Sequence, residues 1–305
     1  MNWQDEIEAA AQRIRPFLRK TPTLRAEGFY LSCPVELKLE QVQHTGSFKA
    51  RGAFNTLLSS DVPKAGVVAA SGGNHGAAVG FAASRLGHPA RIFVPEMAGP
   101  AKIALIQRTS ADLTVVSGAY SNALDAARDH ETRTGAMQIH AYDAPATVAG
   151  QGTVMREWEE QGLEADTVLI AVGGGGLIAG ALAWLGGRRK VVAVEPDTAC
   201  TLHAALKAGT PVDVEVSGIA ANALGARRIG QICFDLSRHS VQSVLVNDTA
   251  IAQAQQALWH ETRQLVEPAG ATALAALMSG AYRPAPGERI AVLICGGNLA
   301  PDPMA

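Results

Sequence analysis

Lys49 stands in a setting that suits covalent chemistry by an amine. It follows Thr-Gly-Ser-Phe and precedes residues 50–58, a stretch that favours a helix, with Ser47 predicted to cap the first turn. The positive end of a helix dipole and the neighbouring ring of Phe48 would both disfavour the ammonium, so we expect a lowered pKa for Lys49. A lysine with a lowered pKa can form a Schiff base with an aldehyde. The alternative is an ordinary surface lysine at a helix start, which is what an isolated Ser-x-Lys most often marks.

Four consecutive glycines follow an apolar strand-like run and open the helical stretch 177–185. They are Gly173, Gly174, Gly175 and Gly176. Because they lack Cβ atoms, their N–H groups can surround a phosphate, and the dipole of the following helix adds to the attraction. A nucleotide-binding loop is the alternative, but there is no Gly-Lys-Ser/Thr and no spaced Gly-x-Gly-x-x-Gly with a partner acid. We therefore favour an anchor for a single phosphate group.

Two further segments place polar residues where an apolar run ends. Ser71-Gly72-Gly73-Asn74-His75 follows one such run and opens a helical stretch. Backbone N–H groups at a helix start suit a carboxylate, and the Ser71 hydroxyl can add another donor. Cys295 ends the run 289–294 and is followed by Gly-Gly-Asn. A single cysteine at a strand end is otherwise typical of a buried core.

Together and in this order, the four segments resemble the fold-type II pyridoxal phosphate enzymes, specifically the threonine/serine dehydratase and serine racemase group. The resemblance runs from about Thr21 to Asn298. It implies that Lys49 holds pyridoxal 5'-phosphate and removes the α-proton of an amino-acid substrate as general base. The cofactor contacts that it implies, besides Lys49, are Phe48, Asn74, Gly173, Gly174, Gly175, Gly176, Leu177, Glu267 and Cys295. The substrate contacts that it implies are Ser71, Gly72, Gly73, Asn74, His75 and Tyr142.

Within that resemblance, several residues bear on the reaction. Cys295 takes the position that faces the pyridine nitrogen, where a thiol does not protonate the ring, and this favours β-elimination. Gly72 stands where serine racemases carry a serine that serves as the base on the opposite face, so racemisation is disfavoured. Tyr142 matches the aromatic residue of the dehydratases. Asn74 is expected to bond the ring hydroxyl of the cofactor, and His75 to support the loop rather than to act as a base or metal ligand.

The sequence leaves a cation site open. Many relatives bind a divalent or monovalent cation through the pattern Glu-Pro-x-x-Ala-x-Asp. Here Glu195 and Ala199 match the pattern, but Thr201 stands at the position of the acid. A hard cation would lose one anionic oxygen ligand there, so the pattern decides neither for nor against a metal.

Composition argues against several other classes of protein. A chain of 305 residues with 48% hydrophobic residues and a formal net charge of −2 can bury a large core. It carries no long basic run, so we expect no nucleic-acid partner and no membrane partner. The uncharged stretch 168–187 is long enough to span a bilayer, but its many glycines argue against a lipid-exposed helix. Four cysteines without metal-type spacing, and an acidic N-terminus without a signal-peptide core, predict free thiols and a cytoplasmic location.

Alternating strand and helix patterns must position these residues. The pattern is β-α-β-α-β-α-β from about residue 66 to residue 140, and a second alternating stretch includes residues 168–195. The patterns and the resemblance together predict an α/β fold of two open twisted parallel sheets flanked by helices, the tryptophan synthase β-like arrangement. A smaller domain, 53–143, would be inserted in a larger one, 1–52 and 144–305, with the site where the sheets meet. Gly150-Gln-Gly-Thr153 is expected to open a helix near the domain junction.

We therefore expect a pyridoxal phosphate-dependent ammonia-lyase that converts L-threonine, L-serine or a related β-hydroxy amino acid into a 2-oxo acid and ammonia. Racemisation of serine, or another β-elimination or β-replacement, is the alternative at the same cofactor. A catalytically silent binding protein and a nucleotide-binding α/β protein are the alternatives from other classes. The expected partners are the small-molecule amino-acid substrate and further copies of the chain in a homo-oligomer.

Overall fold

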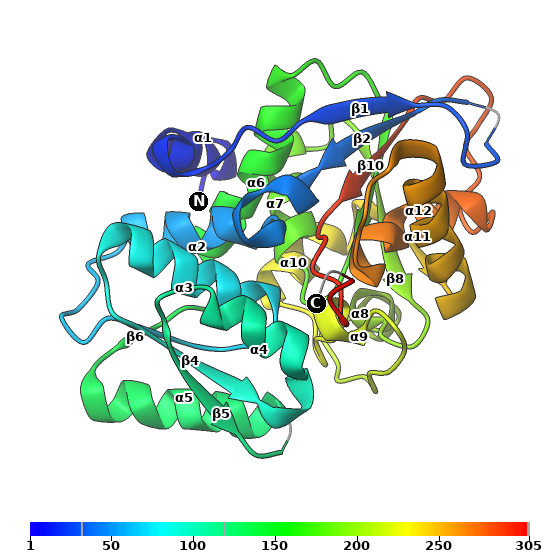
Figure 1. Cartoon of the computed structure of the whole chain (residues 1–305). Coiled ribbons are helices and arrows are strands. Elements are labelled where there is room, and N and C mark those ends of the chain that lie inside the picture. The colour runs from blue at the N-terminus through cyan, green and yellow to red at the C-terminus, as the bar shows by residue number, and fades with distance from the viewer. Residues whose placement is uncertain (32, 119, 304–305) are drawn as a thin grey trace.

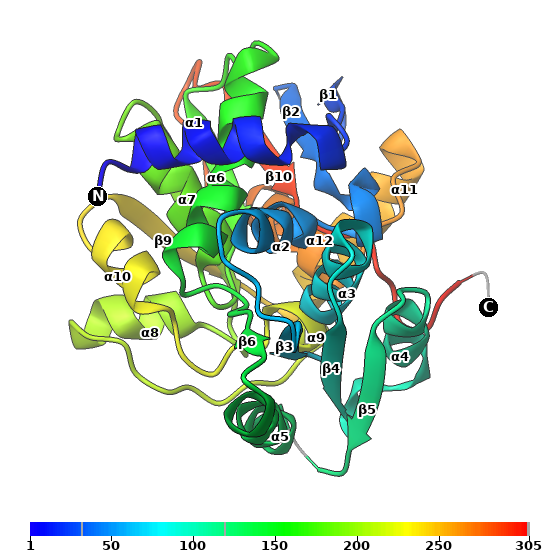
Figure 2. The same cartoon turned by 90° about the vertical axis from the view of Figure 1, so that its left-hand side faces the viewer.

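The computed structural model describes residues 1–31, 33–118 and 120–303, which form a four-stranded and a six-stranded sheet with helices on the faces of both (Figure 1). In Figure 1 the four-stranded sheet lies at the lower left and the six-stranded sheet at the upper right. The view turned by 90° shows helix α2 (Lys49–Leu58) in the middle of the molecule, between the two sheets (Figure 2). This architecture confirms the predicted α/β fold class.

The smaller sheet is parallel and has the strand order β5-β4-β3-β6. Because successive side chains of a strand point to opposite faces, Val67 and Ala69 pack with α2 and α3, whereas Val68 and Ala70 pack with α5. The strands are β3 (Val67–Ala70), β4 (Ala90–Pro95), β5 (Asp112–Val116) and β6 (Met137–Gln138), and the helices are α3 (Asn74–Leu86), α4 (Pro100–Gln107) and α5 (Tyr120–Thr134).

The larger sheet has the strand order β1-β2-β10-β7-β8-β9. Its strands are β1 (Thr23–Ala26), β2 (Val35–Leu39), β7 (Thr167–Ala171), β8 (Lys190–Pro196), β9 (Val241–Val246) and β10 (Ile290–Ile294). Figure 1 shows α6 (Pro145–Glu160) and α7 (Gly176–Leu185) on one side of this sheet, and α11 (Asp248–Thr262) and α12 (Pro268–Met278) on the other. Strands β7 and β10 are buried along their whole length, as expected for parallel strands covered on both faces. The remaining helices are α1 (Trp3–Ile14), α8 (Thr201–Ala208), α9 (Ala221–Leu224) and α10 (Gln231–Ser237).

Two features differ from the prediction. Strand β1 runs antiparallel to β2, so the larger sheet is not parallel throughout; the eight residues between these strands are too few for a crossover. Helix α6 begins at Pro145, so Gly150 lies inside it and does not open it. A Cβ built on Gly150 would lie 2.7 Å from the carbonyl oxygen of Arg51. The glycine therefore marks the close approach of α6 to α2 and not a helix start.

The uncharged stretch 168–187 consists of strand β7, a loop and helix α7. Among the described residues, no helix is both long and apolar enough to cross a bilayer. The division into a small domain, 53–143, and a large domain, 1–52 and 144–305, stays a prediction. Hydrogen-bonded sheets define layers of the structure and do not by themselves show units that fold alone.

Candidate active site

Lys49 is the first residue of α2, and its Nζ donates a hydrogen bond of 2.8 Å to the carbonyl oxygen of Ala141. The Nζ also lies 5.1 Å from the centre of the Phe48 ring. Burial lowers the pKa of Lys49 to about 8, which is the predicted direction. The share of this amine that is neutral and nucleophilic near physiological pH is therefore much larger than for an ordinary lysine.

Ser47 does not cap helix α2, so this prediction is wrong. Its backbone is extended and forms an isolated antiparallel bridge with Gly296, and Phe48 takes the N-cap position. The N–H group of Phe48 donates to the carbonyl oxygen of Cys295 at 3.2 Å. Lys49 is therefore fixed by the end of the central strand β10 and not by a local cap.

The glycine loop connects β7 to the start of α7. Gly175 has φ of +91°, a left-handed backbone that disfavours any residue with a Cβ. A Cβ on Gly175 would also collide with Sγ of Cys233. The ring of Tyr142 packs directly over Gly174, where a Cβ would overlap it. Since the first N–H groups of α7 have no partners inside the helix, the loop and the helix start offer a group of donors to an anion.

A small cavity of about 40 Å³ lies where these segments meet. All residues that the resemblance assigned to the cofactor line it: Phe48, Lys49, Asn74, Gly173, Gly174, Gly175, Gly176, Leu177, Glu267 and Cys295. The lining also includes Ala171, Ala223, Leu224 and Ala269, which the sequence reasoning missed. Small apolar side chains carry no chemical signal of their own in a sequence, although Ala171 and Ala269 each lie two residues from a predicted cofactor contact, Gly173 and Glu267.

Asn74 lies at the centre of a polar network between the two sheets. Its Nδ2 donates to Oε1 of Glu267 at 2.6 Å, and its Oδ1 accepts from Nδ2 of Asn298 at 2.8 Å. Burial raises the pKa of Glu267 to about 7. Burial also raises the pKa of the Cys295 thiol far above its usual range, and Sγ donates to the carbonyl oxygen of Ala269 at 3.3 Å. Cys295 therefore presents a neutral thiol at this site.

The residues assigned to the substrate lie beside this cavity, and of them only Asn74 lines it. Oγ of Ser71 accepts the N–H of Gly73 at 3.2 Å. A Cβ built on Gly72 would lie 2.5 Å from Cβ of Ala98, so the loop has no space for a side chain there. Nε2 of His75 is 2.9 Å from the carbonyl oxygen of Ile139, and burial lowers the pKa of this imidazole to about 3. A neutral His75 bound to a backbone carbonyl fits the expected supporting role.

Tyr142 follows β6 of the smaller sheet and lies against the glycine loop of the larger sheet. Its hydroxyl donates to the carbonyl oxygen of Arg228 at 3.3 Å, and burial raises its pKa to about 12. Its ring meets that of His140 edge-on, with 4.9 Å between the ring centres. Tyr142 is therefore a neutral aromatic wall above the glycine loop.

In the structure, the residues of the possible cation site bind backbone groups and one another. Both carboxylate oxygens of Glu195 accept backbone N–H groups, from Leu202 at 2.7 Å and from His203 at 2.8 Å, and thus close the first turn of α8. The Thr201 hydroxyl lies 3.3 Å from Oε1 of Glu195 and donates to the carbonyl oxygen of Gly173 at 2.7 Å. A hydroxyl therefore takes the place that an acid has in the relatives. Across the described part of the chain, no three His, Cys, Asp or Glu residues form a group that could hold a metal.

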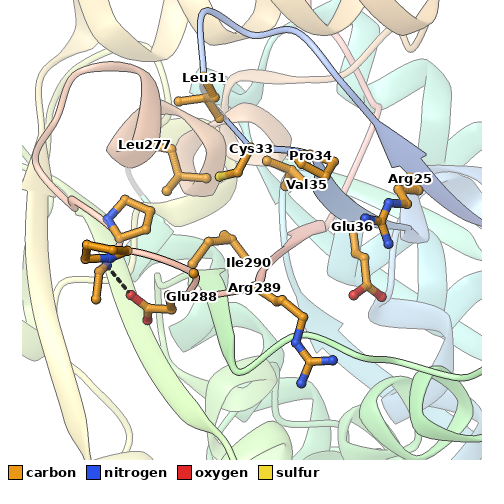
Figure 3. Close-up of a pocket in the computed structure, with 14 residues that line it drawn as sticks. Arg25, Leu31, Cys33, Pro34, Val35, Glu36, Leu277, Glu288, Arg289 and Ile290 are labelled. Atoms are coloured by element: carbon orange, nitrogen blue, oxygen red, sulfur yellow. Dashed lines mark hydrogen bonds between the residues drawn. The ribbon is translucent and has the colours of Figure 1, made fainter.

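A larger hollow of about 540 Å³ lies at the opposite end of the sheet, near the amino ends of β2 and β10 (Figure 3). Figure 3 shows Leu31, Cys33 and Leu277 on one side of it and Arg25, Glu36 and Arg289 on another. Open α/β sheets bind their ligands at the carboxyl ends of the strands. The smaller cavity around Lys49 is therefore the better candidate for the active site.

Comparison with known proteins shows the family of the chain. Residues 14–296 match the family model described as pyridoxal-phosphate dependent enzyme. The chain is 35% identical over 300 residues to a phenylserine dehydratase of Ralstonia pickettii, covering 96% of this chain and 92% of that protein. It is 34% identical over 301 residues to an L-threonine ammonia-lyase of Geobacter sulfurreducens, covering 96% of this chain and 75% of that protein.

Solved structures give the same result. The fold is similar to that of maize serine racemase, with a TM-score of 0.92 and 30% identity over 97% of this chain and 93% of that one. It is also similar to a T.th. threonine deaminase, with a TM-score of 0.90 and 34% identity over 97% of this chain and 98% of that one. Lyases and a racemase thus share this fold. Which of the two reactions a protein with this fold catalyses must therefore be inferred from the residues of its site.

Proposed function

Because the chain belongs to the pyridoxal-phosphate-dependent enzymes and is a lyase of their dehydratase type, we propose that its substrate is L-threonine, L-serine or a related β-hydroxy amino acid such as phenylserine. The products would be a 2-oxo acid and ammonia. The observation that carries this proposal is the gathering of Lys49, the four glycines and Cys295 around one cavity. These groups come from three distant parts of the chain.

The residues around the cavity fit pyridoxal phosphate. A lysine amine with a lowered pKa is present to hold the aldehyde carbon, and the glycine loop before the ten-residue helix α7 suits the phosphate group. Asn74 and Cys295 would meet the ring, and Cys295 does so as a neutral thiol. When bound, pyridoxal phosphate withdraws electrons from the α-carbon of the substrate.

Different residues of the chain would bind the substrate and move its α-proton. We infer that the amine of Lys49 takes the α-proton of the substrate as general base, because its pKa of about 8 lies close to the working pH. The backbone of the Ser71–Asn74 loop at the start of α3 would bind the substrate carboxylate. Cys295, as a neutral thiol, would supply no charge to a cofactor ring beside it, and this would favour elimination of the β-hydroxyl.

Racemisation of serine is the second candidate, because a serine racemase is among the similar structures. Racemisation needs a proton donor on each face of the α-carbon. Gly72 has no side chain to provide one, and its packing against Ala98 leaves no room for one. We therefore place elimination ahead of racemisation.

Ammonia release from L-serine, L-threonine, 3-hydroxyaspartate and phenylserine tests the proposal, with chiral chromatography of the serine reaction in parallel. We expect ammonia from at least one substrate and little D-serine. The Lys49→Ala protein should fold but lose turnover at least about a thousandfold, because the base and the cofactor attachment are both removed. Lys64→Ala, at an exposed lysine outside the cavity, is the matched control.

Two results would contradict the proposal. Wild-type protein that releases ammonia from none of these amino acids would exclude the lyase reaction. D-serine that accumulates as fast as pyruvate would place racemisation first.

Borohydride reduction and peptide mapping should locate the pyridoxyl group on Lys49, and its recovery on Lys38 or Lys102 would overturn the site assignment.

We also propose a cytoplasmic location and self-association. The four cysteines are free thiols, which supports a reducing compartment. Tyr30, Trp259 and Leu265 are exposed large apolar side chains, which supports an interface with a second copy of the chain. Light scattering on the purified protein measures the oligomeric state directly.

A further inference from the structure

Lys102 is a second buried lysine beside the cleft between the two sheets. It lies on α4, and only 5% of its surface is exposed. Its Nζ donates to the carbonyl oxygen of Asn222, on α9 of the larger sheet's side, at 2.7 Å. An ammonium has three N–H donors. Within residues 1–31, 33–118 and 120–303, this carbonyl is the only hydrogen-bond acceptor that Lys102 has.

The Nζ of Lys102 is next to the loop that precedes α3. A Cβ built on Gly73 would lie 3.4 Å from Nζ of Lys102 and 3.6 Å from the carbonyl oxygen of Asn222. Gly73 is the N-cap residue of α3, a helix of 13 residues whose first N–H groups have no partners inside the helix. An ammonium and a helix start, both of which attract anions, are therefore neighbours here.

No anion forms a hydrogen bond with Lys102 among the described residues. The carboxylate that acts on it is Glu267, but Oε1 of Glu267 accepts the amide of Asn74 at 2.6 Å. Burial raises the pKa of Glu267 to about 7 and lowers the pKa of Lys102 to about 8, because each charge lies away from water. A buried ammonium without an anionic hydrogen-bond partner is costly. An anion that enters the loop would remove this cost.

We propose that Lys102 binds the α-carboxylate of the amino-acid substrate, together with the backbone N–H groups of Gly72 and Asn74. The inference rests on the proposed function, since it takes an amino acid as the substrate. Two N–H donors of Lys102 are available to the carboxylate while the third stays on the Asn222 carbonyl. The bound carboxylate would thus connect α3 and α4 on one side of the cleft with α9 on the other. Lys102 would make the enzyme specific for free amino acids over their amides.

L-Alanine and L-alaninamide test this specificity, because they differ only at the carboxylate and carry no β-hydroxyl to eliminate. Their inhibition constants against L-serine turnover therefore report binding alone. Lys102→Gln keeps a donor for the Asn222 carbonyl but removes the charge. We expect the KM for L-serine and the inhibition constant of L-alanine to rise about 10- to 100-fold, the range of a charge-assisted hydrogen bond. The inhibition constant of L-alaninamide and the kcat for L-serine should change little.

Two further variants complete the design. Lys102→Arg keeps the charge and should recover part of the preference for the carboxylate. Lys64→Gln, at an exposed lysine away from the cleft, should behave as wild type. If the ratio of the two inhibition constants in Lys102→Gln equals that of the wild type, the proposal is wrong and Lys102 only joins α4 to α9.

A measurement on the wild-type holoenzyme covers the case in which Lys102→Gln does not fold. Acetylation by acetic anhydride, followed by peptide mass spectrometry, reports how accessible the Lys102 amine is. L-Alanine should protect Lys102 and L-alaninamide should not, whereas equal labelling with both would overturn the proposal. Failure of the proposed function looks different, because the wild-type protein would then release no ammonia from β-hydroxy amino acids.

Discussion

The amine of Lys49 donates to the Ala141 carbonyl at 2.8 Å and has no carboxylate as a hydrogen-bond partner among the described residues. Burial therefore acts on this ammonium with little compensation, and its pKa falls to about 8. At pH 7 about one tenth of such amines are neutral, whereas an ordinary lysine amine is neutral in well under a thousandth of molecules. The surroundings of one residue thus make it far more nucleophilic than other lysines.

The pH dependence of cofactor capture follows from this shift. Only the neutral amine attacks an aldehyde, so the rate at which the apoprotein binds pyridoxal phosphate covalently should rise about tenfold per pH unit at low pH. The rate should level off above pH of about 8, where the amine of Lys49 is mostly neutral. Stopped-flow absorbance measures the rate, with Lys49→Ala as the control that shows no capture. A rate that still rises tenfold per pH unit near pH 10 would mean that the pKa of Lys49 is not lowered.

Short segments that directly follow an apolar strand could be predicted well from the sequence. The glycines 173–176 and Cys295 follow apolar runs, and the carboxyl ends of parallel strands are where such folds bind ligands. Contacts between residues that are far apart in the sequence could not be predicted. Ser47 pairs with Gly296 across most of the chain, and Lys102 meets Asn222, which is 120 residues away. Helix α12 was also missed, because its run of alanine and leucine lacks the polar face that marks a surface helix.

Helix α2, which begins with Lys49, is anchored by a buried ionic cluster. Arg51 is 2% exposed, and its Nη2 lies 2.7 Å from Oε1 of Glu40 and 3.0 Å from Oε1 of Glu157. Nζ of Lys38 lies 2.6 Å from the same oxygen of Glu157. The cluster ties α2 to β2 and α6, so it holds the start of α2 in place.

Removal of one charge from this cluster should be costly. Arg51→Met leaves Glu40 buried without its cation, so we expect the free energy of unfolding in urea to fall by about 3–5 kcal/mol. The matched control is Arg289→Met, which breaks an ion pair with Asp166 whose side chains are 57% and 48% exposed. That change should cost less than about 1 kcal/mol. Equal losses in the two variants would show that the cluster does not stabilise the fold through its buried charge.

On the scale of the whole molecule, the candidate site joins the two sheets. Asn74 and Lys102 come from the smaller sheet's side, whereas Glu267, Asn222 and the glycine loop come from the larger sheet's side. A cofactor held by both sides should stabilise both. Ligand present at a hundred times its dissociation constant stabilises a folded protein by about 2.7 kcal/mol.

Removal of pyridoxal phosphate with hydroxylamine should therefore lower the melting temperature, and adding it back should restore the original value. Hydrogen exchange tells which part responds: peptides from residues 67–95 and from residues 167–185 should both lose protection in the apoprotein. Lys49→Ala treated in the same way is the control, since it lacks the covalent attachment. Loss of protection confined to the second peptide would mean that the cofactor is held by the larger sheet alone.

Strand β10 lies between β2 and β7 in the larger sheet, although it is the last of that sheet's strands to be made. A ribosome that has synthesised Lys49 and the glycine loop has therefore not yet supplied the strand that separates β2 from β7. Until residues 290–294 emerge, those two strands keep open edges, and open edges recruit strands from other chains. The smaller sheet is built from the continuous segment 67–138 and has no such delay. A nascent chain that stalls between residues 177 and 289 would thus already contain Lys49 and the glycine loop, but its larger sheet would still have open strand edges that promote aggregation.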